Sequence, residues 1–223
     1  MRFIPYLRYF FYVAWNWGPA PAFFILYHEI RGERKYHLRT IGADSLRKLR
    51  DRGIDLSHAH RYMPVNYYVL EHLMREISRY PHNKTFLDLG CGKGRAMMVA
   101  ADYGFEDISG VDLSPEFRDE LVATIAHDHH LKKTVRFTIV TGNAADYEIP
   151  SDVTTIFLFN PFDEVIVARV ISNIQASYRQ RPRTIRILYA NPVHKPLFIQ
   201  SGFREIYELR KLDFFEGSIL EYR

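Results

Sequence analysis

From residue 62 to the C-terminus, strand and helix patterns alternate, and this alternation constrains the fold more than any other feature. Short apolar runs bounded by glycine, proline or polar residues predict strands, and apolar residues three or four positions apart predict the helices between them. Strands that alternate with helices form parallel sheets covered on both faces. The predicted strands are 85–89, 108–111, 135–140, 154–159, 184–190, 204–212 and 218–222.

The end of the chain breaks the alternation. Only the segment 213–217 separates the last two predicted strands, which is too short for a helical crossover, so they should pair as a hairpin. The predicted fold is therefore α/β: a mostly parallel, doubly wound seven-stranded sheet with a C-terminal antiparallel hairpin, plus an N-terminal helical cap. We predict an extension over residues 1–61 and a domain over residues 62–223. Ligands of such sheets bind at the carboxyl ends of the strands.

The sharpest motif, Asp88–Gly94, reads Asp-Leu-Gly-Cys-Gly-Lys-Gly and follows the first predicted strand. Glycines there let the backbone turn tightly and approach a ligand. A Walker phosphate-binding loop is excluded because Lys93 is followed by glycine, not by serine or threonine. The dinucleotide pattern Gly-x-Gly-x-x-Gly fails at Arg95. The acid two residues before Gly90 suits a ligand that carries an amino group better than a pyrophosphate.

The pattern Asp-x-Gly-x-Gly-x-Gly resembles the first motif of class I S-adenosylmethionine (SAM)-dependent methyltransferases. Gly110-Val111-Asp112, at the end of the second strand, looks like the acidic ribose-binding position of that family. Gly142-Asn143-Ala144, after the third strand, resembles the loop beside adenine. The resemblance covers about residues 62–223 and implies SAM as cofactor. The SAM-binding residues it implies are Asp88, Gly90, Cys91, Gly92, Gly94, Asp112, Leu113, Asn143, Ala144 and Asn160.

Asn160-Pro161-Phe162 follows the fourth predicted strand, where the resemblance places the reactive sulfonium. It looks like a shortened Asn-Pro-Pro-Tyr/Phe motif, similar to those of methyltransferases that act on planar nitrogens such as adenine or glutamine amide. The second proline of that motif is missing here, which counts against adenine and glutamine. The alternative is a strand-to-helix turn in which Asp163 caps the next helix.

Tyr62, in the segment Tyr62-Met63-Pro64, resembles a residue of small seven-strand protein-lysine methyltransferases. It either covers the SAM pocket or is a packing aromatic before a helix. The candidate catalytic residues are therefore Asn160, Pro161, Phe162 and Tyr62. The resemblance implies methyl transfer to an amine-type nitrogen, with a protein side chain as the leading acceptor. Nucleic-acid and small-molecule methyltransferases, and a non-catalytic protein of the same fold that only binds, stay open as alternatives.

The segment Tyr9–His28 is aromatic and contains no Lys, Arg, Asp or Glu. Its length matches a membrane span, but glycine and prolines near its middle favour two helices with a break. Arg31–Tyr36 is interpreted as a polar turn and Asp44–Arg52 as a short charged helix. A cap packed on the domain is the leading interpretation of this segment. Interfacial membrane contact, a true span and a signal peptide are the alternatives.

Charge is unevenly distributed along the chain. Residues 1–61 hold 11 Lys/Arg and 5 Asp/Glu, whereas residues 62–223 hold 19 and 21. A basic N-terminal segment could attract a polyanion or an anionic membrane, or be a solvated helical face. We therefore expect peripheral membrane contact through residues 1–30 as one option, and nucleic acid as a less favoured one.

The single cysteine excludes an internal disulfide and suits a reducing compartment, so we expect a cytoplasmic protein. The only histidine clusters, His58/His60 and His127/His129/His130, lack the spacing of a structural zinc site, so no metal is expected.

Overall fold

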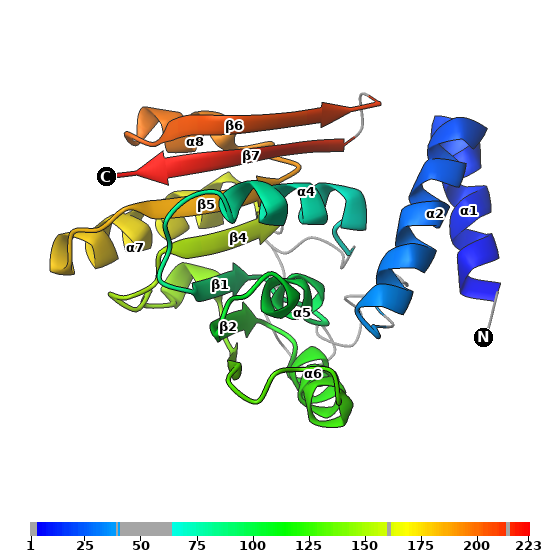
Figure 1. Ribbon diagram of the computed structural model, residues 1–223. Coiled ribbons are helices and arrows are strands. Elements are labelled where there is room, and N and C mark those ends of the chain that lie inside the picture. Colours follow the sequence, from blue (N-terminus) through cyan, green and yellow to red (C-terminus); the bar gives the residue numbers. More distant parts are fainter. Residues whose placement is uncertain (1–3, 39, 41–63, 160–161, 213–214) are drawn as a thin grey trace.

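The computed structural model describes residues 4–38, 40, 64–159, 162–212 and 215–223 (Figure 1). One seven-stranded sheet has the strand order β3-β2-β1-β4-β5-β7-β6. The strands are β1 Thr85–Leu89, β2 Asp107–Asp112, β3 Arg136–Thr141, β4 Thr155–Phe159, β5 Ile185–Ala190, β6 Arg204–Lys211 and β7 Phe215–Tyr222.

Strands β1 to β5 pair in parallel, and β7 pairs antiparallel with both β5 and β6. This confirms the predicted sheet and its C-terminal hairpin. Leu89 of β1 lies opposite Val111 of β2 and Leu158 of β4, so the carboxyl ends of these three strands are level. From β1 the sheet continues through β2 to β3 on one side, and from β4 it continues through β5 on the other side. The strand order therefore reverses between β1 and β4, and the carboxyl ends of these two strands form the switch point of the sheet.

Helices cover both faces of the sheet. Consecutive residues of β1 point to opposite sides: Phe86 belongs to an apolar cluster with α4, α5 and α6, whereas Leu87 belongs to another cluster with α7 and α8. These helices are α4 Tyr67–Ile77, α5 Arg95–Asp102, α6 Pro115–His127, α7 Glu164–Gln180 and α8 Lys195–Gln200, and η1 Ala144–Asp146 is a 3-10 turn. The layered arrangement predicted from the alternating pattern is thereby confirmed.

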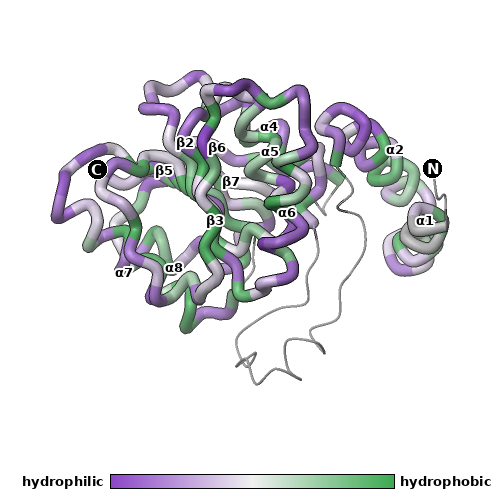
Figure 2. The backbone as a smooth tube through the Cα atoms, turned by 90° about the horizontal axis from the view of Figure 1, so that it is seen from below, coloured by the Kyte–Doolittle hydropathy of each residue, from purple (hydrophilic) through white to green (hydrophobic). Residues whose placement is uncertain are grey.

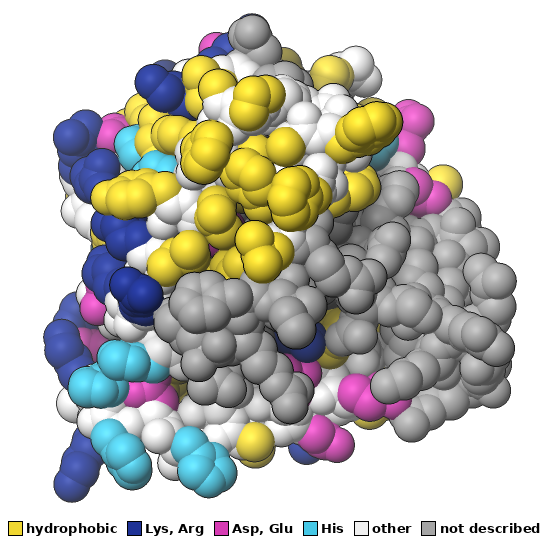
Figure 3. Space-filling view, turned by 90° about the vertical axis from the view of Figure 1, so that its right-hand side faces the viewer, with side chains coloured by type: hydrophobic (Ala, Val, Ile, Leu, Met, Phe, Trp, Pro, Cys, Tyr) yellow, Lys and Arg dark blue, Asp and Glu magenta, His cyan; other side chains and the backbone are white. Residues whose placement is uncertain are grey.

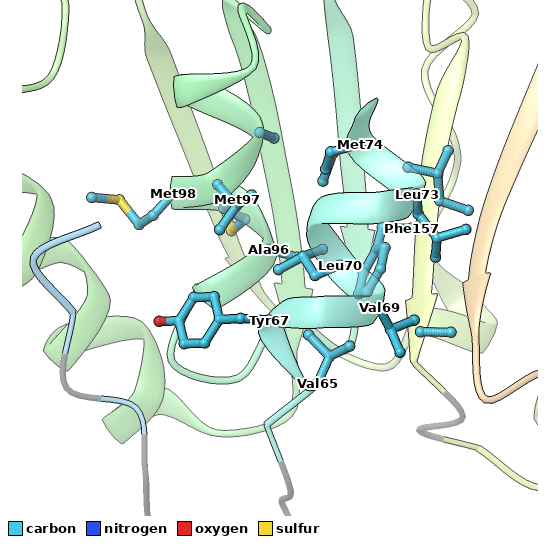
Figure 4. Close-up of a cluster of buried hydrophobic side chains, with 14 of the residues drawn as sticks. Val65, Tyr67, Val69, Leu70, Leu73, Met74, Ala96, Met97, Met98 and Phe157 are labelled. Carbon is cyan, nitrogen blue, oxygen red and sulfur yellow. The ribbon is translucent and has the colours of Figure 1, made fainter. Parts of the chain in front are cut away.

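Helix α4 shows how the sequence pattern builds the core. The side chain of Asn66 accepts a hydrogen bond from the backbone N–H of Tyr68 at 2.8 Å, which caps the helix start. Leu70 and Met74, four residues apart, are fully buried on its inner face. Figure 4 shows this face directed toward Met97 of α5. Each buried aliphatic side chain contributes about 2–3 kcal/mol.

Two helices, α1 Ile4–Trp17 and α2 Pro19–Lys35, precede the alternating part. Gly18, with φ 91°, separates them, and Pro19 begins α2, which confirms the predicted break. Ile25 of α2 belongs to the same apolar cluster as the buried residues of α4, so the pair of N-terminal helices packs on the rest of the molecule. Figure 2 shows α1 and α2 to one side of the sheet.

The predicted polar turn at Arg31–Tyr36 is wrong, because α2 continues through it to Lys35. Gly32 lies inside the helix at a place where a Cβ would collide with the ring of Tyr67. The glycine at this position therefore permits close packing of α2 against Tyr67 and does not end the helix. The predicted helix Asp44–Arg52 lies outside the described residues. Within the described part of the chain, no helix is both long and apolar enough to cross a membrane.

Candidate active site

Most of the residues that the sequence singled out lie together at one edge of the sheet. The glycine loop follows β1, Asp112 ends β2, Asn143 follows β3 and Phe162 follows β4. These four strands are neighbours and run parallel, so their carboxyl ends meet at the same edge. Figure 1 shows this edge facing the side of the molecule on which α1 and α2 stand.

The glycine loop is fastened to the neighbouring strand. The backbone N–H groups of Gly90 and Cys91 both donate to the carbonyl oxygen of Val111, at 2.8 and 3.0 Å. Gly94 starts α5 with φ 77°, a left-handed conformation that favours glycine. A Cβ at Gly94 would also collide with the side chain of Leu121. Backbone conformation and packing thus both require glycine at this end of the loop.

Asp112 joins the glycine loop to the start of α6. One carboxylate oxygen accepts from the backbone N–H of Gly92 at 2.8 Å, and the other accepts from Ser114 at 2.9 Å. Each carboxylate oxygen has a second lone pair, so the group can accept two further hydrogen bonds. Two adjacent hydroxyls, such as those of a ribose, are donors of the required kind. Burial raises the pKa of Asp112, while the two backbone hydrogen bonds oppose that rise.

Asp88 is a buried carboxyl group, only 3% exposed. No hydrogen bond from a described residue reaches its side chain, in contrast to Asp112. Burial raises the pKa of Asp88 well above its usual value, and the nearby charge of Asp112 raises it further. A buried carboxylate without a partner is costly, so a cationic group of a ligand would stabilise it.

We expect Asp88→Asn to stabilise the ligand-free protein at neutral pH by at least about 1 kcal/mol, because the amide removes an uncompensated charge. The pKa of Asp88 is higher in the folded state than its usual value of 3.8, so the folded protein takes up this proton at a higher pH than the unfolded chain. The wild type therefore gains stability as pH falls toward 3.8. The difference between variant and wild type should therefore shrink in that direction. Urea unfolding at several pH values measures it, with Asp107→Asn as a control; a variant less stable than the wild type at neutral pH would contradict the expectation.

Cys91 lies in the glycine loop but has the properties of a packing residue. It is 6% exposed, and burial together with the charges of Asp88 and Asp112 raises the pKa of its thiol well above the usual value. A thiol in this state stays protonated at neutral pH and is a poor nucleophile. Cys91 can line a ligand through its backbone and its apolar side chain.

The loop after β3 is ordered by Asn143, whose side-chain oxygen accepts from the backbone N–H of Ala145 at 3.0 Å. This bond starts η1 and leaves the amide nitrogen of Asn143 available as a donor. Ala144 beside it is buried, and Leu113 on the neighbouring strand end is partly exposed. These contacts are compatible with a site for a flat heterocycle, and the assignment of both loops to adenine and ribose stays a prediction.

The predicted acceptor side is described only in part, because Tyr62, Asn160 and Pro161 lie outside the described residues. Phe162 is 8% exposed and belongs to the apolar cluster of α7. Asp163 accepts from the backbone N–H of Ile166 at 3.1 Å and so caps α7. The helix cap expected of Asp163 is therefore present, and a role of Phe162 toward an acceptor stays a prediction.

Arg95, which directly follows the glycine loop, is a buried residue whose role the sequence analysis missed. It is 3% exposed, and its guanidinium nitrogens lie 2.8 Å from a carboxylate oxygen of Glu29 and 3.7 Å from one of Glu33. Both carboxylates belong to α2 and are themselves buried. An ion-paired network therefore connects the N-terminal helices to the first residue of α5.

The same guanidinium holds the chain on both sides of residues 41–63. Its Nε donates to the hydroxyl of Thr40 at 2.7 Å, and one terminal nitrogen donates to the carbonyl oxygen of Val65 at 2.6 Å. It also lies over the ring of Tyr67, 4.1 Å from the centroid. A single arginine between Gly94 and an apolar helical run was the only sequence signal for this network.

Among the residues that the structure describes, no group of three or more His, Cys, Asp or Glu side chains is arranged to hold a metal ion. The described polar groups at the strand ends suit an organic ligand with hydroxyls and a cationic group.

Sheet order, antiparallel end strand and glycine loop together define the class I methyltransferase fold. Residues 86–180 match the family described as "Methyltransferase domain". The chain is 28% identical over 133 residues to a protein-lysine N-methyltransferase of Saccharolobus islandicus, a match that covers 59% of this chain and 80% of that one.

Solved structures share this fold. A Pyrococcus abyssi tRNA (uracil-54, C5)-methyltransferase has a TM-score of 0.52 at 14% identity over 72% of this chain, which spans only 39% of that larger enzyme. The glycopeptide N-methyltransferase MtfA, solved with SAM, has a TM-score of 0.51 at 15% identity over 68% of this chain and 92% of its own. The chain thus has the fold of class I SAM-dependent methyltransferases and contains a segment that matches a methyltransferase domain, and such a domain implies SAM as cofactor.

Proposed function

We propose that this protein binds SAM over the loop Gly90–Gly94 and transfers its methyl group to an amine-type nitrogen, with a protein side chain as acceptor. The observation that carries the proposal is the pair of carboxyl groups around this loop. Asp112 keeps two acceptor positions open, and Asp88 is buried without a hydrogen-bonding partner among the described residues. In the proposed complex Asp112 accepts from the ribose hydroxyls and Asp88 stabilises the ligand's amino group.

When bound, SAM supplies a methyl group on a sulfonium, which is open to direct displacement. Binding and orientation are then the main contributions of the protein, because the nucleophile must stand in line with the breaking bond. A lysine acceptor has to lose its proton first, and desolvation beside a cationic centre lowers its pKa. We assign the acceptor side to Tyr62, Asn160, Pro161 and Phe162, which keeps these residues as candidates for mutation.

The choice of a protein acceptor is supported by the curated relative, a protein-lysine N-methyltransferase. The structural neighbours act on different acceptors by their names, a tRNA and a glycopeptide, and their low identity limits that likeness to the fold. A nucleic-acid acceptor is the second candidate, because residues 1–61 carry a clear excess of positive charge. Net charge beyond residue 61 is slightly negative, which favours the protein acceptor.

Two measurements test the proposed function in sequence. Calorimetry should show binding of SAM and none of NAD; heat with NAD alone would overturn the cofactor assignment. Tritiated SAM is then offered with the enzyme to a cell extract that has been treated with protease or with nuclease. We expect protease to abolish the labelled product and nuclease to leave it, and the opposite pattern would establish the nucleic-acid acceptor.

A further inference from the structure

The outer face of α1 is apolar, although it faces solvent. Val13 on the inner face is fully buried, whereas Leu7, Phe11 and Trp15 follow one another at four-residue spacing with exposures of 53%, 65% and 91%. Helices on a protein surface normally carry polar residues on the outer face. An almost completely exposed tryptophan at the end of an apolar stripe therefore indicates that something covers this face when the protein works.

Helix α2 extends the same surface. Phe23 and Tyr27, again four residues apart, are 64% and 63% exposed. The ring of Phe23 lies 4.9 Å from that of Phe10 on α1, so the two helices form one continuous unit. Figure 3 shows hydrophobic side chains gathered in a broad patch at this end of the molecule, with Lys and Arg side chains along one border.

The charges of these helices restrict what can cover them. Residues 4–35 contain only two carboxylates, Glu29 and Glu33, and both are buried against Arg95. Every exposed charged side chain described on α1 and α2 is therefore basic. These side chains lie at the C-terminal end of α2, where Arg31 pairs with Glu71 and Lys35 with Asp102. An aromatic face that ends in basic residues is typical of helices that lie in the interface of an anionic membrane.

We propose that the outer face of α1 and α2 docks on a lipid bilayer that contains anionic lipid, with the helices lying in the interface. A helix of 14 or 17 residues is too short to span the hydrocarbon core, which needs about 20. Figure 1 shows the pair at the end of the sheet where the glycine loop and Asp112 lie. Docking through this face would therefore bring the candidate active site close to the membrane surface, where a membrane-associated acceptor would be within reach.

The two tryptophans give a direct test, because Trp15 and Trp17 are the only ones in the chain and both lie on α1. The full chain is mixed with vesicles of phosphatidylcholine alone or of phosphatidylcholine with phosphatidylserine. We expect co-sedimentation and a blue shift of the fluorescence with the anionic vesicles, both reduced by salt. If the protein binds neither kind of vesicle, the proposal is overturned. This result is independent of the proposed function, because methyl transfer is not measured.

A matched pair of variants locates the contact. Phe11→Ser with Phe23→Ser removes two exposed rings, keeps both tryptophans, and should lower vesicle partitioning by at least roughly tenfold. Val165→Ser with Ile199→Ser removes exposed apolar residues from α7 and α8, 55% and 45% exposed, and should leave partitioning unchanged. Equal loss in the two double variants, or none in either, would overturn the assignment to this face.

A second readout does not depend on a variant of the patch. In Trp17→Phe protein, Trp15 becomes the only fluorophore, and brominated lipids should quench it. Unquenched Trp15 on bound vesicles would overturn the proposed orientation. A blue shift that grows with protein concentration and needs no vesicles would instead assign the face to a second copy of the chain, and it would also overturn the proposal.

Discussion

Replacement of Asp112 by alanine is expected to lower the affinity for SAM at least about 100-fold while the sheet stays folded. Hydrogen bonds to a charged group contribute about 1.5–3 kcal/mol each, and two such bonds to a ribose are lost together. The loss has a second source, because the Asp112 carboxylate also accepts from Gly92 and Ser114 and thereby shapes the glycine loop. Isothermal titration with SAM measures the effect directly.

Asp107 is the matched control, since it begins the same strand that Asp112 ends. Its side chain is 45% exposed and pairs with Arg136 at the surface. Exposed ion pairs contribute at most about 1 kcal/mol to stability. Asp107→Ala should therefore bind SAM like the wild type. Asp112→Asn tests the second source of loss. It replaces one acceptor oxygen by an N–H₂ group, which must then face the backbone N–H of Gly92 or Ser114. SAM affinity equal to that of the wild type in Asp112→Ala would remove the ribose assignment.

Most of the sheet could be predicted because strand signals are local. Apolar runs such as 85–89 and 154–159 match β1 and β4 to within a residue, and the short segment before the last strand correctly predicts a hairpin. Strand β7 shows the limit of this reasoning. The sequence pattern predicts that it starts at residue 218, but it begins at Phe215, and Gly217 lies inside it, opposite Ala190. A Cβ at Gly217 would press against Leu73 and Val69 of α4, contacts far away in the sequence.

The N-terminal helices show the same limit more strongly. Glu29 and Glu33 look like surface charges in the sequence, and Gly32 between them looks like a helix breaker. In the folded chain the two carboxylates face Arg95, more than 60 residues away, and the glycine fits beneath Tyr67. The roles of the two glutamates and of the glycine depend on which distant residue lies opposite them in the fold. Local sequence patterns do not contain this information. That the glycine loop, Asp112 and Asn143 lie at one edge of the sheet, by contrast, follows from motif order alone because parallel strands bring their carboxyl ends together.

Replacement of Arg95 by methionine should lower the free energy of unfolding by about 3–5 kcal/mol, because it leaves the buried carboxylates of Glu29 and Glu33 without their cation. Methionine retains the apolar stem of the side chain but loses the guanidinium, and with it the ion pairs and the hydrogen bonds to Thr40 and Val65. Burial already raises the pKa of Glu29, and removal of Arg95 raises it further. The destabilisation should therefore be largest where Glu29 is ionised and should diminish as pH falls. Urea unfolding at two pH values measures both effects.

Arg136→Met is the control, since Arg136 is 74% exposed in its pair with Asp107 and its loss should cost no more than about 1 kcal/mol. The double variant Arg95→Met with Glu29→Met distinguishes a charge effect from a packing effect. Buried ion pairs can often be replaced by apolar side chains of similar size at little cost, so the double variant should recover part of the stability that the single one loses. If it is less stable than Arg95→Met alone, then packing and hydrogen bonding to Thr40 and Val65 outweigh the charges, and Arg95 acts chiefly as the anchor of the chain around residues 41–63.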